Sequence, residues 1–219
     1  MGIIVAIDGP AGSGKSSTAR EVARRLGFTY IDTGAMYRSV TLAAIRQKID
    51  IRDEPKVTQI AEQSRIRFKW INGRYCTFLN GEDVSEAIRS SAVAKLVSPV
   101  STIPGVRQIM ANRQRQLAQD DNIVMEGRDI GTNVFPHANF KFYLDADIRV
   151  RAKRREKDYH GLGQHLTLEQ IVGELAKRDQ IDSSRQHSPL KKAEDAITID
   201  TTHLTFEEQV TKIVKLIQQ

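Results

Sequence analysis

A glycine-rich segment near the beginning of the sequence carries its clearest chemical signal. Residues 9–16 read GPAGSGKS and match the pattern G-x-x-x-x-G-K-[ST] in full. Glycines allow such a loop to turn its backbone N–H groups inward around a phosphate, and a helix that starts at the loop adds the positive end of its dipole. The segment therefore predicts a binding site for a nucleoside triphosphate.

The side chains of this loop suggest individual roles. Lys15 can bridge the β- and γ-phosphates, and the Ser16 hydroxyl can bind the Mg²⁺ that accompanies ATP. We expect one continuous stretch to contact ATP, namely Gly9, Pro10, Ala11, Gly12, Ser13, Gly14, Lys15, Ser16 and Ser17. The pattern leaves open which molecule accepts the phosphoryl group and whether hydrolysis is the reaction.

Arginine residues follow two of the short apolar runs that predict strands. Arg38 lies in the first turns of a helix expected after residues 28–31, and Arg128-Asp129 follows residues 123–125. Ligands of parallel α/β sheets bind beyond the carboxyl ends of the strands, so these residues are candidates for holding a second anionic substrate. An ordinary surface position is the alternative interpretation, above all for Arg38.

A third set of candidates lies in the last quarter of the chain. Arg178, Asp182 and Arg185 are spaced i, i+4 and i+7, so they share one face of a helix if that helix persists far enough. Such a set could bind a polar ligand. The alternative is an exposed ion pair of little energetic value.

The segment 148–158 is strongly basic and is followed by Gly161-Leu162-Gly163. Beside a phosphate-binding loop, a basic helix next to a glycine break indicates a lid that closes over the reacting group. Its candidate arginines are Arg151, Arg154 and Arg155. A solvated, purely structural helix face is the alternative.

The remaining sequence predicts the elements that position these residues. Buried strands are expected near residues 3–7, 28–31, 123–125, 140–144 and 196–199, and they alternate with helical patterns. This order predicts an α/β fold with a parallel central sheet covered by helices. Asn72-Gly73 and Asn80-Gly81 separate alternating runs and predict a small antiparallel β insert at about 63–84, with helices at about 86–97 and 106–119 after it.

Composition limits the class of protein. The chain has 219 residues, 40% of them apolar, and a formal net charge of +6, which indicates a globular protein with anionic partners. Its apolar runs are too short for a transmembrane helix. The single cysteine, Cys76, is expected in a strand and fits a reducing compartment. We expect a cytoplasmic protein without a membrane or nucleic-acid partner, and we expect it to be a monomer.

Several classes of phosphate-binding protein compete. A switch GTPase needs an Asn-Lys-x-Asp segment late in the chain, and the sequence has none. A small kinase fits better, because it needs arginines for a phosphorylated acceptor and for a lid. A kinase for another small acceptor, a regulatory NTPase that only hydrolyses, and a basic nucleic-acid-binding module remain open alternatives.

Four stretches together resemble the bacterial cytidylate kinase family, the nucleoside monophosphate kinases that phosphorylate CMP and dCMP. They are IDGPAGSGKSS, DTGAMYR, EGRDIGT with VFP following, and KRDQIDSSR. The resemblance implies a P-loop nucleoside monophosphate kinase-like fold: a single kinase domain over 1–219, with an arginine-rich lid. Its core would comprise about 1–60, 98–147 and 183–219, its monophosphate-binding insert about 61–97, and its lid about 148–166.

The resemblance also implies roles for single residues. Arg38, Arg128 and Arg185 would hold the CMP phosphate near Thr33, and Arg178 and Asp182 would bind the ribose. The base would be recognised by Ser98, Arg107 and Asp129. Lys15, Arg128 and the lid arginines would stabilise the transferring phosphoryl group.

Overall fold

The strand that precedes the phosphate-binding loop lies at the centre of the main sheet. The computed structural model describes residues 2–119, 121–161 and 166–219. In it β1 (Ile4–Asp8) is buried along its whole length, as its unbroken apolar sequence predicts. It pairs in parallel with β6 (Ile123–Gly127) on one side and β7 (Phe140–Asp145) on the other. The carboxyl ends of these strands therefore meet at one edge.

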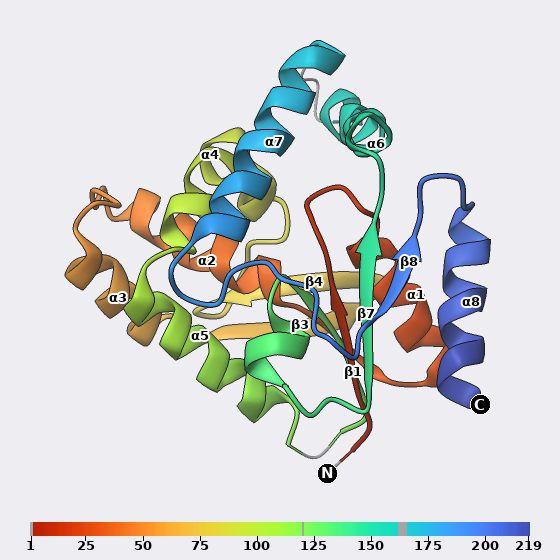
Figure 1. Cartoon of the computed structure of the whole chain (residues 1–219). Helices are drawn as coiled ribbons and strands as arrows, with labels where there is room; N and C mark the ends of the chain where they lie inside the picture. The colour runs from red at the N-terminus through yellow and green to blue at the C-terminus, as the bar shows by residue number, and fades with distance from the viewer. Residues whose placement is uncertain (1, 120, 162–165) are drawn as a thin grey trace. The chain divides into compact units, whose positions relative to one another are not determined.

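Two further strands complete this five-stranded sheet, whose order is β2-β6-β1-β7-β8. They are β2 (Thr29–Asp32) and β8 (Ile197–Asp200), and β8 pairs in parallel with β7. Helices flank the sheet (Figure 1). The α/β fold with a parallel central sheet is confirmed.

The chain divides into two compact units. Unit 1 contains Met1–Ile31 and Ala118–Gln219, and unit 2 contains Asp32–Leu117. Unit 1 holds most of the main sheet and the phosphate-binding loop. Unit 2 contains the small antiparallel sheet and its own apolar core.

The helices of unit 1 form two pairs. Helix α1 (Lys15–Leu26) packs against α8 (Phe206–Gln218), and α6 (Ile148–Gly161) packs against α7 (Leu168–Ser184). Helix α7 begins with a capping box: the Thr167 hydroxyl accepts from Gln170 N, and the Gln170 side chain accepts from Thr167 N. A short π-helical turn, η2 (Ile130–Val134), follows β6.

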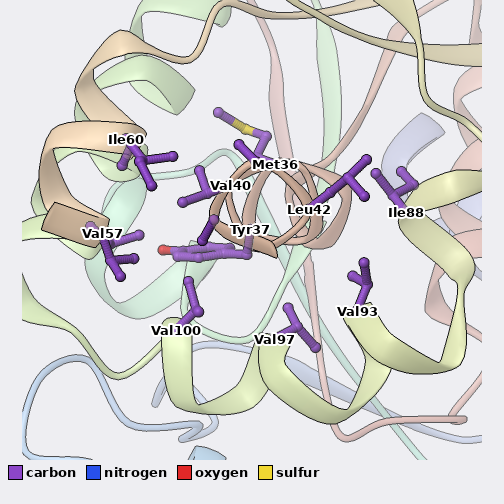
Figure 2. Packing of buried hydrophobic residues seen from close by; sticks show 14 of the residues in the cluster. Met36, Tyr37, Val40, Leu42, Val57, Ile60, Ile88, Val93, Val97 and Val100 are labelled. Atoms are coloured by element: carbon purple, nitrogen blue, oxygen red, sulfur yellow. The ribbon is translucent and has the colours of Figure 1, made fainter. Parts of the chain in front are cut away.

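Unit 2 is built around helix α2 (Thr33–Arg46). Its neighbours are α3 (Glu54–Gln63), the 3₁₀ turn η1 (Ala87–Arg89), α4 (Ser91–Val100) and α5 (Pro104–Leu117). Figure 2 shows Tyr37 of α2 pointing into the middle of this core, with Val57 on one side and Val100 and Val97 below. Tyr37 thus packs in the core.

The antiparallel insert is confirmed. Strands β3 (Ile66–Ile71) and β4 (Arg74–Leu79) pair around Asn72-Gly73, and both turn residues have positive φ, 49° and 75°. Asn80-Gly81 repeats this geometry, at 53° and 93°, before β5 (Glu82–Asp83). Asn and Gly tolerate this conformation best, which explains why the sequence signal is reliable. Cys76 lies buried in β4.

Two boundaries differ from expectation. The helix expected at about 86–97 is split, because Ser90 adopts an extended conformation and its hydroxyl caps α4 at Val93 N. Helix α6 runs to Gly161, so it includes the first residue of the expected glycine break, whereas residues 162–165 lie outside the described residues. Among the described residues, every helix is too short or too polar to span a bilayer.

The core of unit 2 provides a test of the packing. Met110 in α5 is fully buried, whereas Leu117 at the end of the same helix is 40% exposed. Met110→Ala should lower the free energy of unfolding by about 2–5 kcal/mol because it leaves a cavity. Leu117→Ala, the matched control, should cost much less. Urea unfolding measures both, and equal losses would contradict this account of the core.

Candidate active site

The phosphate-binding loop, residues 9–17, is folded around the Lys15 side chain. Lys15 Nζ donates a hydrogen bond to the Pro10 carbonyl oxygen at 2.6 Å and another to Ser13 Oγ at 3.4 Å. Ser13 Oγ itself donates to the same carbonyl at 3.1 Å. Helix α1 begins at Lys15, so its N-terminal N–H groups and the lysine ammonium converge on one place.

Two glycines of the loop have conformations or surroundings that other residues would not tolerate. A Cβ atom on Gly9 would lie 2.0 Å from the Leu144 carbonyl oxygen of the neighbouring strand β7. Gly14, immediately before α1, has a φ of 90°. The glycines of the sequence pattern are therefore required by the fold of the loop itself.

The C-terminal part of the chain supports the loop from outside. The buried Thr201 hydroxyl donates to the Ser13 carbonyl oxygen at 3.1 Å, and Arg154 of α6 donates to the Thr201 carbonyl oxygen at 2.6 Å. Thr18 of α1 donates to the Gln209 side chain of α8 at 3.1 Å. The conformation of the loop thus depends on residues almost 200 positions away in the sequence.

An ion pair between Arg151 of α6 and Asp179 of α7 holds the tip of the phosphate-binding loop. Arg151 Nη1 lies 2.6 Å from the Asp179 carboxylate and 3.0 Å from the Ala11 carbonyl oxygen, while its Nε donates to the Ala146 carbonyl oxygen at 3.0 Å. Asp179 also accepts a hydrogen bond from Ala11 N at 3.4 Å. Both groups on the Ala11 backbone are therefore tied to this ion pair.

The other two expected lid arginines face different partners. Arg154 bonds to Thr201, as described. The Arg155 guanidinium lies 4.8 Å from the Tyr159 ring centre and 3.6 Å from the Asp158 carboxylate. Part of the expected lid, residues 162–165, lies outside the described residues.

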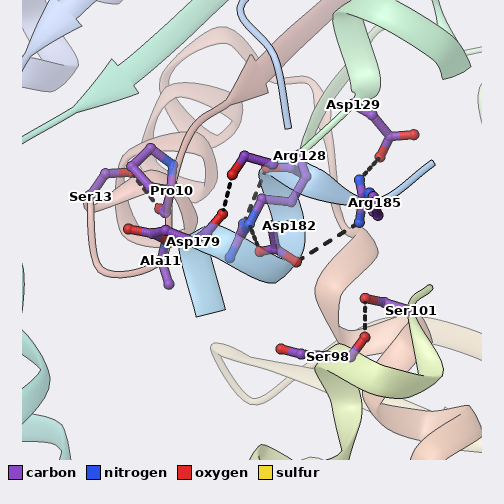
Figure 3. Close-up of polar contacts among 12 residues, drawn as sticks. Pro10, Ala11, Ser13, Ser98, Ser101, Arg128, Asp129, Asp179, Asp182 and Arg185 are labelled. Carbon is purple, nitrogen blue, oxygen red and sulfur yellow. Dashed lines mark hydrogen bonds and ion pairs between the residues drawn. The ribbon is translucent and has the colours of Figure 1, made fainter. Parts of the chain in front are cut away.

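A second polar cluster forms where α7 ends beside the segment after β6. Figure 3 shows the Asp182 carboxylate between Arg128 and Arg185. Arg128 Nε donates to Asp182 at 2.9 Å, and the Arg185 guanidinium lies 3.9 Å from Asp182 and 3.4 Å from Asp129. The structure therefore brings four residues that the sequence singled out into one buried ion-pair network. Arg185 is the C-cap of α7 rather than part of its last turn.

The charges in this network compensate for one another. Burial alone would raise the pKa of Asp182, but the nearby Arg128, Arg178 and Arg185 outweigh that effect and lower it. Burial alone would lower the pKa of Arg128. The carboxylates of Asp182 and Glu126 outweigh this effect and raise the pKa. Asp182 is only 3% exposed, which excludes the interpretation as an ordinary surface ion pair.

The loop lysine lies in the same electrostatic environment. Burial, followed by the charges of Arg128 and Arg178, lowers the pKa of Lys15 from 10.5 to about 7. Glu126 and Asp8 oppose this shift. Burial and the two guanidinium groups thus disfavour the positive charge of Lys15, and an anion beside the ammonium would favour it.

Asp8 connects β1 to the segment after β6. Its carboxylate accepts hydrogen bonds from Ile130 N at 2.9 Å and Gly131 N at 2.8 Å. Burial raises the pKa of Asp8 to about 6, although these two hydrogen bonds lower it. The carboxylate therefore fixes the backbone next to Arg128 and Asp129.

The remaining candidates belong to unit 2. Asp32 caps α2 by accepting from Ala35 N at 2.8 Å, and its second oxygen accepts from Arg38 Nη2 at 2.9 Å. Arg38 Nε is buried without a hydrogen-bond partner among the described residues. Thr33, the first residue of α2, is buried. The Arg38 guanidinium thus retains a donor for a ligand.

Ser98, Ser101 and Arg107 are linked at the end of α4. Ser101 Oγ donates to the Ser98 carbonyl oxygen at 2.8 Å, and Arg107 Nη1 donates to the Ser101 carbonyl oxygen at 3.1 Å. The Arg107 guanidinium also lies 5.7 Å from the centre of the Tyr37 ring. All three polar residues are buried, so they form a polar cluster within unit 2.

Sequence reasoning missed several residues of the site. Asp8 and Glu126 lie at the ends of buried strands, which is a recognisable signal for acidic site residues. Asp179 adjoins Arg178 in sequence, but its carboxylate binds Ala11 N of the phosphate-binding loop and pairs with Arg151. Thr201 carries no signal, because a lone threonine after a strand is common.

Comparison with known proteins gives the family. The family model described as cytidylate kinase matches residues 5–219. A cytidylate kinase of Caldanaerobacter subterraneus subsp. tengcongensis is 48% identical over 98% of this chain and 94% of its own. One from Acholeplasma laidlawii is 48% identical over 99% of this chain and 96% of its own. The chain belongs to the cytidylate kinase family.

As a member of the cytidylate kinase family, the protein is a phosphotransferase. A solved shikimate kinase from Bacteroides thetaiotaomicron has a TM-score of 0.51 at 12% identity, covering 99% of both chains. That likeness shows a shared fold only. It supports the parallel α/β architecture that the order of strands and helices predicts, and the P-loop kinase-like fold that the resemblance implies.

Replacing Asp8 by Asn should change how the stability of the kinase depends on pH. Because burial raises its pKa from 3.8 to about 6, folded Asp8 retains a proton in a pH range where the unfolded chain has released it. Asp8 therefore lowers the free energy of unfolding as pH rises through this range, by up to about 3 kcal/mol. Asp8→Asn lacks this contribution.

Urea unfolding of both proteins at pH 4 and pH 7 measures the effect. The free energy of unfolding of the wild type minus that of the variant should be smaller at pH 7 than at pH 4. Circular dichroism should first show that the variant is folded. An identical pH dependence for the two proteins would show that Asp8 is not buried as described.

Proposed function

We propose that the protein transfers the γ-phosphoryl group of ATP to the phosphate of CMP or dCMP, producing ADP and CDP or dCDP. The observation that carries the proposal is the buried network of Arg128, Asp182, Arg185 and Asp129, which is electrostatically coupled to Lys15 of the phosphate-binding loop. The relatives named cytidylate kinase support CMP as the acceptor.

In this proposal arginines bind the acceptor phosphate. A guanidinium presents a planar fork of donors that matches phosphate oxygens. We assign Arg38, Arg128 and Arg185 to the phosphate, with Thr33 as a hydroxyl donor, and Arg178 and Asp182 to the ribose. The buried Arg38 Nε without a partner supports this assignment.

Recognition of the base is assigned to Asp129, Arg107 and Ser98. Cytosine offers the N4 amino group as a donor, and its ring nitrogen N3 and oxygen O2 as acceptors. A carboxylate accepts from the amino group, and a guanidinium donates to the acceptors. A base with the wrong pattern leaves these buried groups unpaired, which costs binding energy.

Positioning and neutralisation of charge then account for the transfer. The acceptor phosphate is already anionic, so the reaction does not require a strong general base. Lys15 and the backbone N–H groups of the loop hold the phosphates of ATP, in line with the acceptor. We assign Arg151, Arg154 and Arg155 to the transferring group; Arg151 would exchange Asp179 for a phosphate oxygen.

The loop also fits a magnesium ion bound together with ATP. Mg²⁺ takes most of its ligands from phosphates and water, so one protein hydroxyl is a sufficient donor. Ser16, the second residue of α1, is exposed and fits this position. Bound Mg²⁺ would neutralise charge on the β- and γ-phosphates.

A closed lid would exclude water and so prevent loss of ATP by hydrolysis. We propose residues 148–166 as this lid and residues 61–97 as the insert that binds the monophosphate. We further propose that the protein is a cytoplasmic monomer. Its one cysteine, Cys76, is compatible with a reducing compartment.

A panel of acceptors tests the function. With ATP and Mg²⁺, the purified protein should phosphorylate CMP and dCMP and should be far less active with UMP or dTMP. Lys15→Ala should remove activity while leaving circular dichroism unchanged, because the loop loses its central positive charge. Preferred use of UMP or dTMP, or ATP turnover that does not depend on a monophosphate, would contradict the proposal.

The role of Asp129 has a separate test. Uracil carries an acceptor oxygen where cytosine carries the amino group, so a carboxylate at that position favours CMP over UMP. Asp129→Ala should raise KM for CMP by about tenfold or more, leave KM for ATP nearly unchanged, and reduce the preference for CMP over UMP.

The matched control for this test is Asp50→Ala, a change at an exposed carboxylate that pairs only with Arg52 among the described residues. Kinetics of both variants with both acceptors are the measurement. Unchanged selectivity in Asp129→Ala would remove Asp129 from recognition of the base.

A further inference from the structure

A groove in unit 2 contains cations that lie in the proposed insert, residues 61–97, but to which the proposed function assigns no contact with either substrate. It has a volume of about 560 Å³ and is lined by residues of β3, β4 and the segments beside them. The two strands are drawn in yellow and orange in Figure 1. Arg67 and Lys69 line it from β3, Arg65 lines it from the position just before β3, and Phe78 lines it from β4. None of these residues belongs to the phosphate-binding loop.

The spacing of these residues places their side chains on one face of the hairpin. Arg65, Arg67 and Lys69 alternate with Ile66 and Phe68, which pack against the core of unit 2. Since side chains of a strand point to opposite faces in turn, the cations share the outer face. Phe78 lies directly opposite Arg67 in the register, and Lys69 Nζ lies 5.7 Å from the centre of the Phe78 ring.

These cations lack carboxylate partners. Within the described residues, none of Arg65, Arg67 and Lys69 forms an ion pair, and all three are exposed. By contrast, Arg46 and Arg74 elsewhere in unit 2 pair with Glu82 and Glu86. Like charges gathered in one groove repel each other, and an anion bound between them would relieve this repulsion.

The groove has the size and boundaries of a site for one compact anion. Its volume lies within the usual range for small-ligand sites, which is roughly 300–1,000 Å³. On the β5 side one acidic residue adjoins it, because Asp83 lies opposite the groove residue Phe78 in the register. A long polyanion crossing the sheet would meet this carboxylate, whereas a single nucleotide would not.

We propose that this groove is a second nucleotide site, which binds a nucleoside triphosphate. Arg65, Arg67 and Lys69 bind the polyphosphate, and the base lies on the Phe78 ring, beside the side-chain amides of Gln63 and Asn80. The proposal does not depend on the identity of the acceptor in the phosphoryl transfer.

Titration of the ¹⁵N-labelled full-length protein with CTP, followed by NMR, tests the proposal. Amide signals of residues 63–69 and 78–81 should shift saturably. In Arg67→Gln/Lys69→Gln these shifts should require roughly tenfold or more higher CTP concentrations, because two charged contacts are lost. Signals of residues 9–17 should respond as in the wild type, since that loop is unchanged.

Lys212→Gln/Lys215→Gln, which removes two exposed cations of α8, is the matched control and should keep both responses. Phe78→Leu should weaken CTP but leave inorganic tripolyphosphate unaffected. Groove shifts that are absent, or that persist unchanged in Arg67→Gln/Lys69→Gln, would overturn the proposal. Equal binding of CTP and tripolyphosphate would also overturn it. Much tighter binding of a single-stranded oligoribonucleotide would overturn it too, and would assign the groove to RNA.

Discussion

Buried positive charge, and the few carboxylates that compensate for it, is the constraint on which unit 1 depends. Four cations act on the pKa values of one another or of the same carboxylates: Lys15, Arg128, Arg178 and Arg185. Arg128 and Arg185 both pair with Asp182. Removing one partner from a buried ion pair costs far more than the pair contributes to stability. The cluster therefore lowers the stability of a protein that binds no anionic ligand. In a protein that binds two phosphorylated molecules, the ligands compensate for the buried positive charge.

The backbone around this cluster of buried charges is held in place by contacts with side chains. Arg151 and Asp179 tie the Ala11 backbone to α6 and α7, and Thr201 holds the Ser13 carbonyl oxygen. Asp8 holds the N–H groups of the segment that follows Arg128 and Asp129. Because these contacts fix N–H groups and guanidinium groups before any ligand arrives, less reorganisation is needed during reaction.

Local signals in the sequence were sufficient for most of the fold. Residues 4–7 of strand β1 form an unbroken apolar run, the two Asn-Gly turns have positive φ, and Thr167 with Gln170 forms a capping box. Each of these is decided by neighbours in sequence. The split before α4 was not predicted, because Ser90 fits a helix interior or a cap equally well and only its extended backbone decides.

The site was predictable in part for the same reason. The phosphate-binding loop follows from its motif, and two of the predicted arginines, Arg128 and Arg185, meet at Asp182 in the structure. The roles of the predicted residues toward ligands stay predictions. The bond between Arg151 and Asp179 was not predictable, because it joins residues 28 positions apart on two different helices. The supporting role of Thr201 depends on a contact 188 residues away, and no local pattern encodes such a distance.

The order of strands has a consequence for biosynthesis. Both partners of β1 in the sheet, β6 and β7, lie beyond residue 122, and Thr201 and Gln209, which support the loop, come later still. Unit 2, in contrast, is one continuous segment. During translation the phosphate-binding loop leaves the ribosome first but is completed last, so a chain that ends before residue 123 has a first strand without either of its neighbours in the sheet.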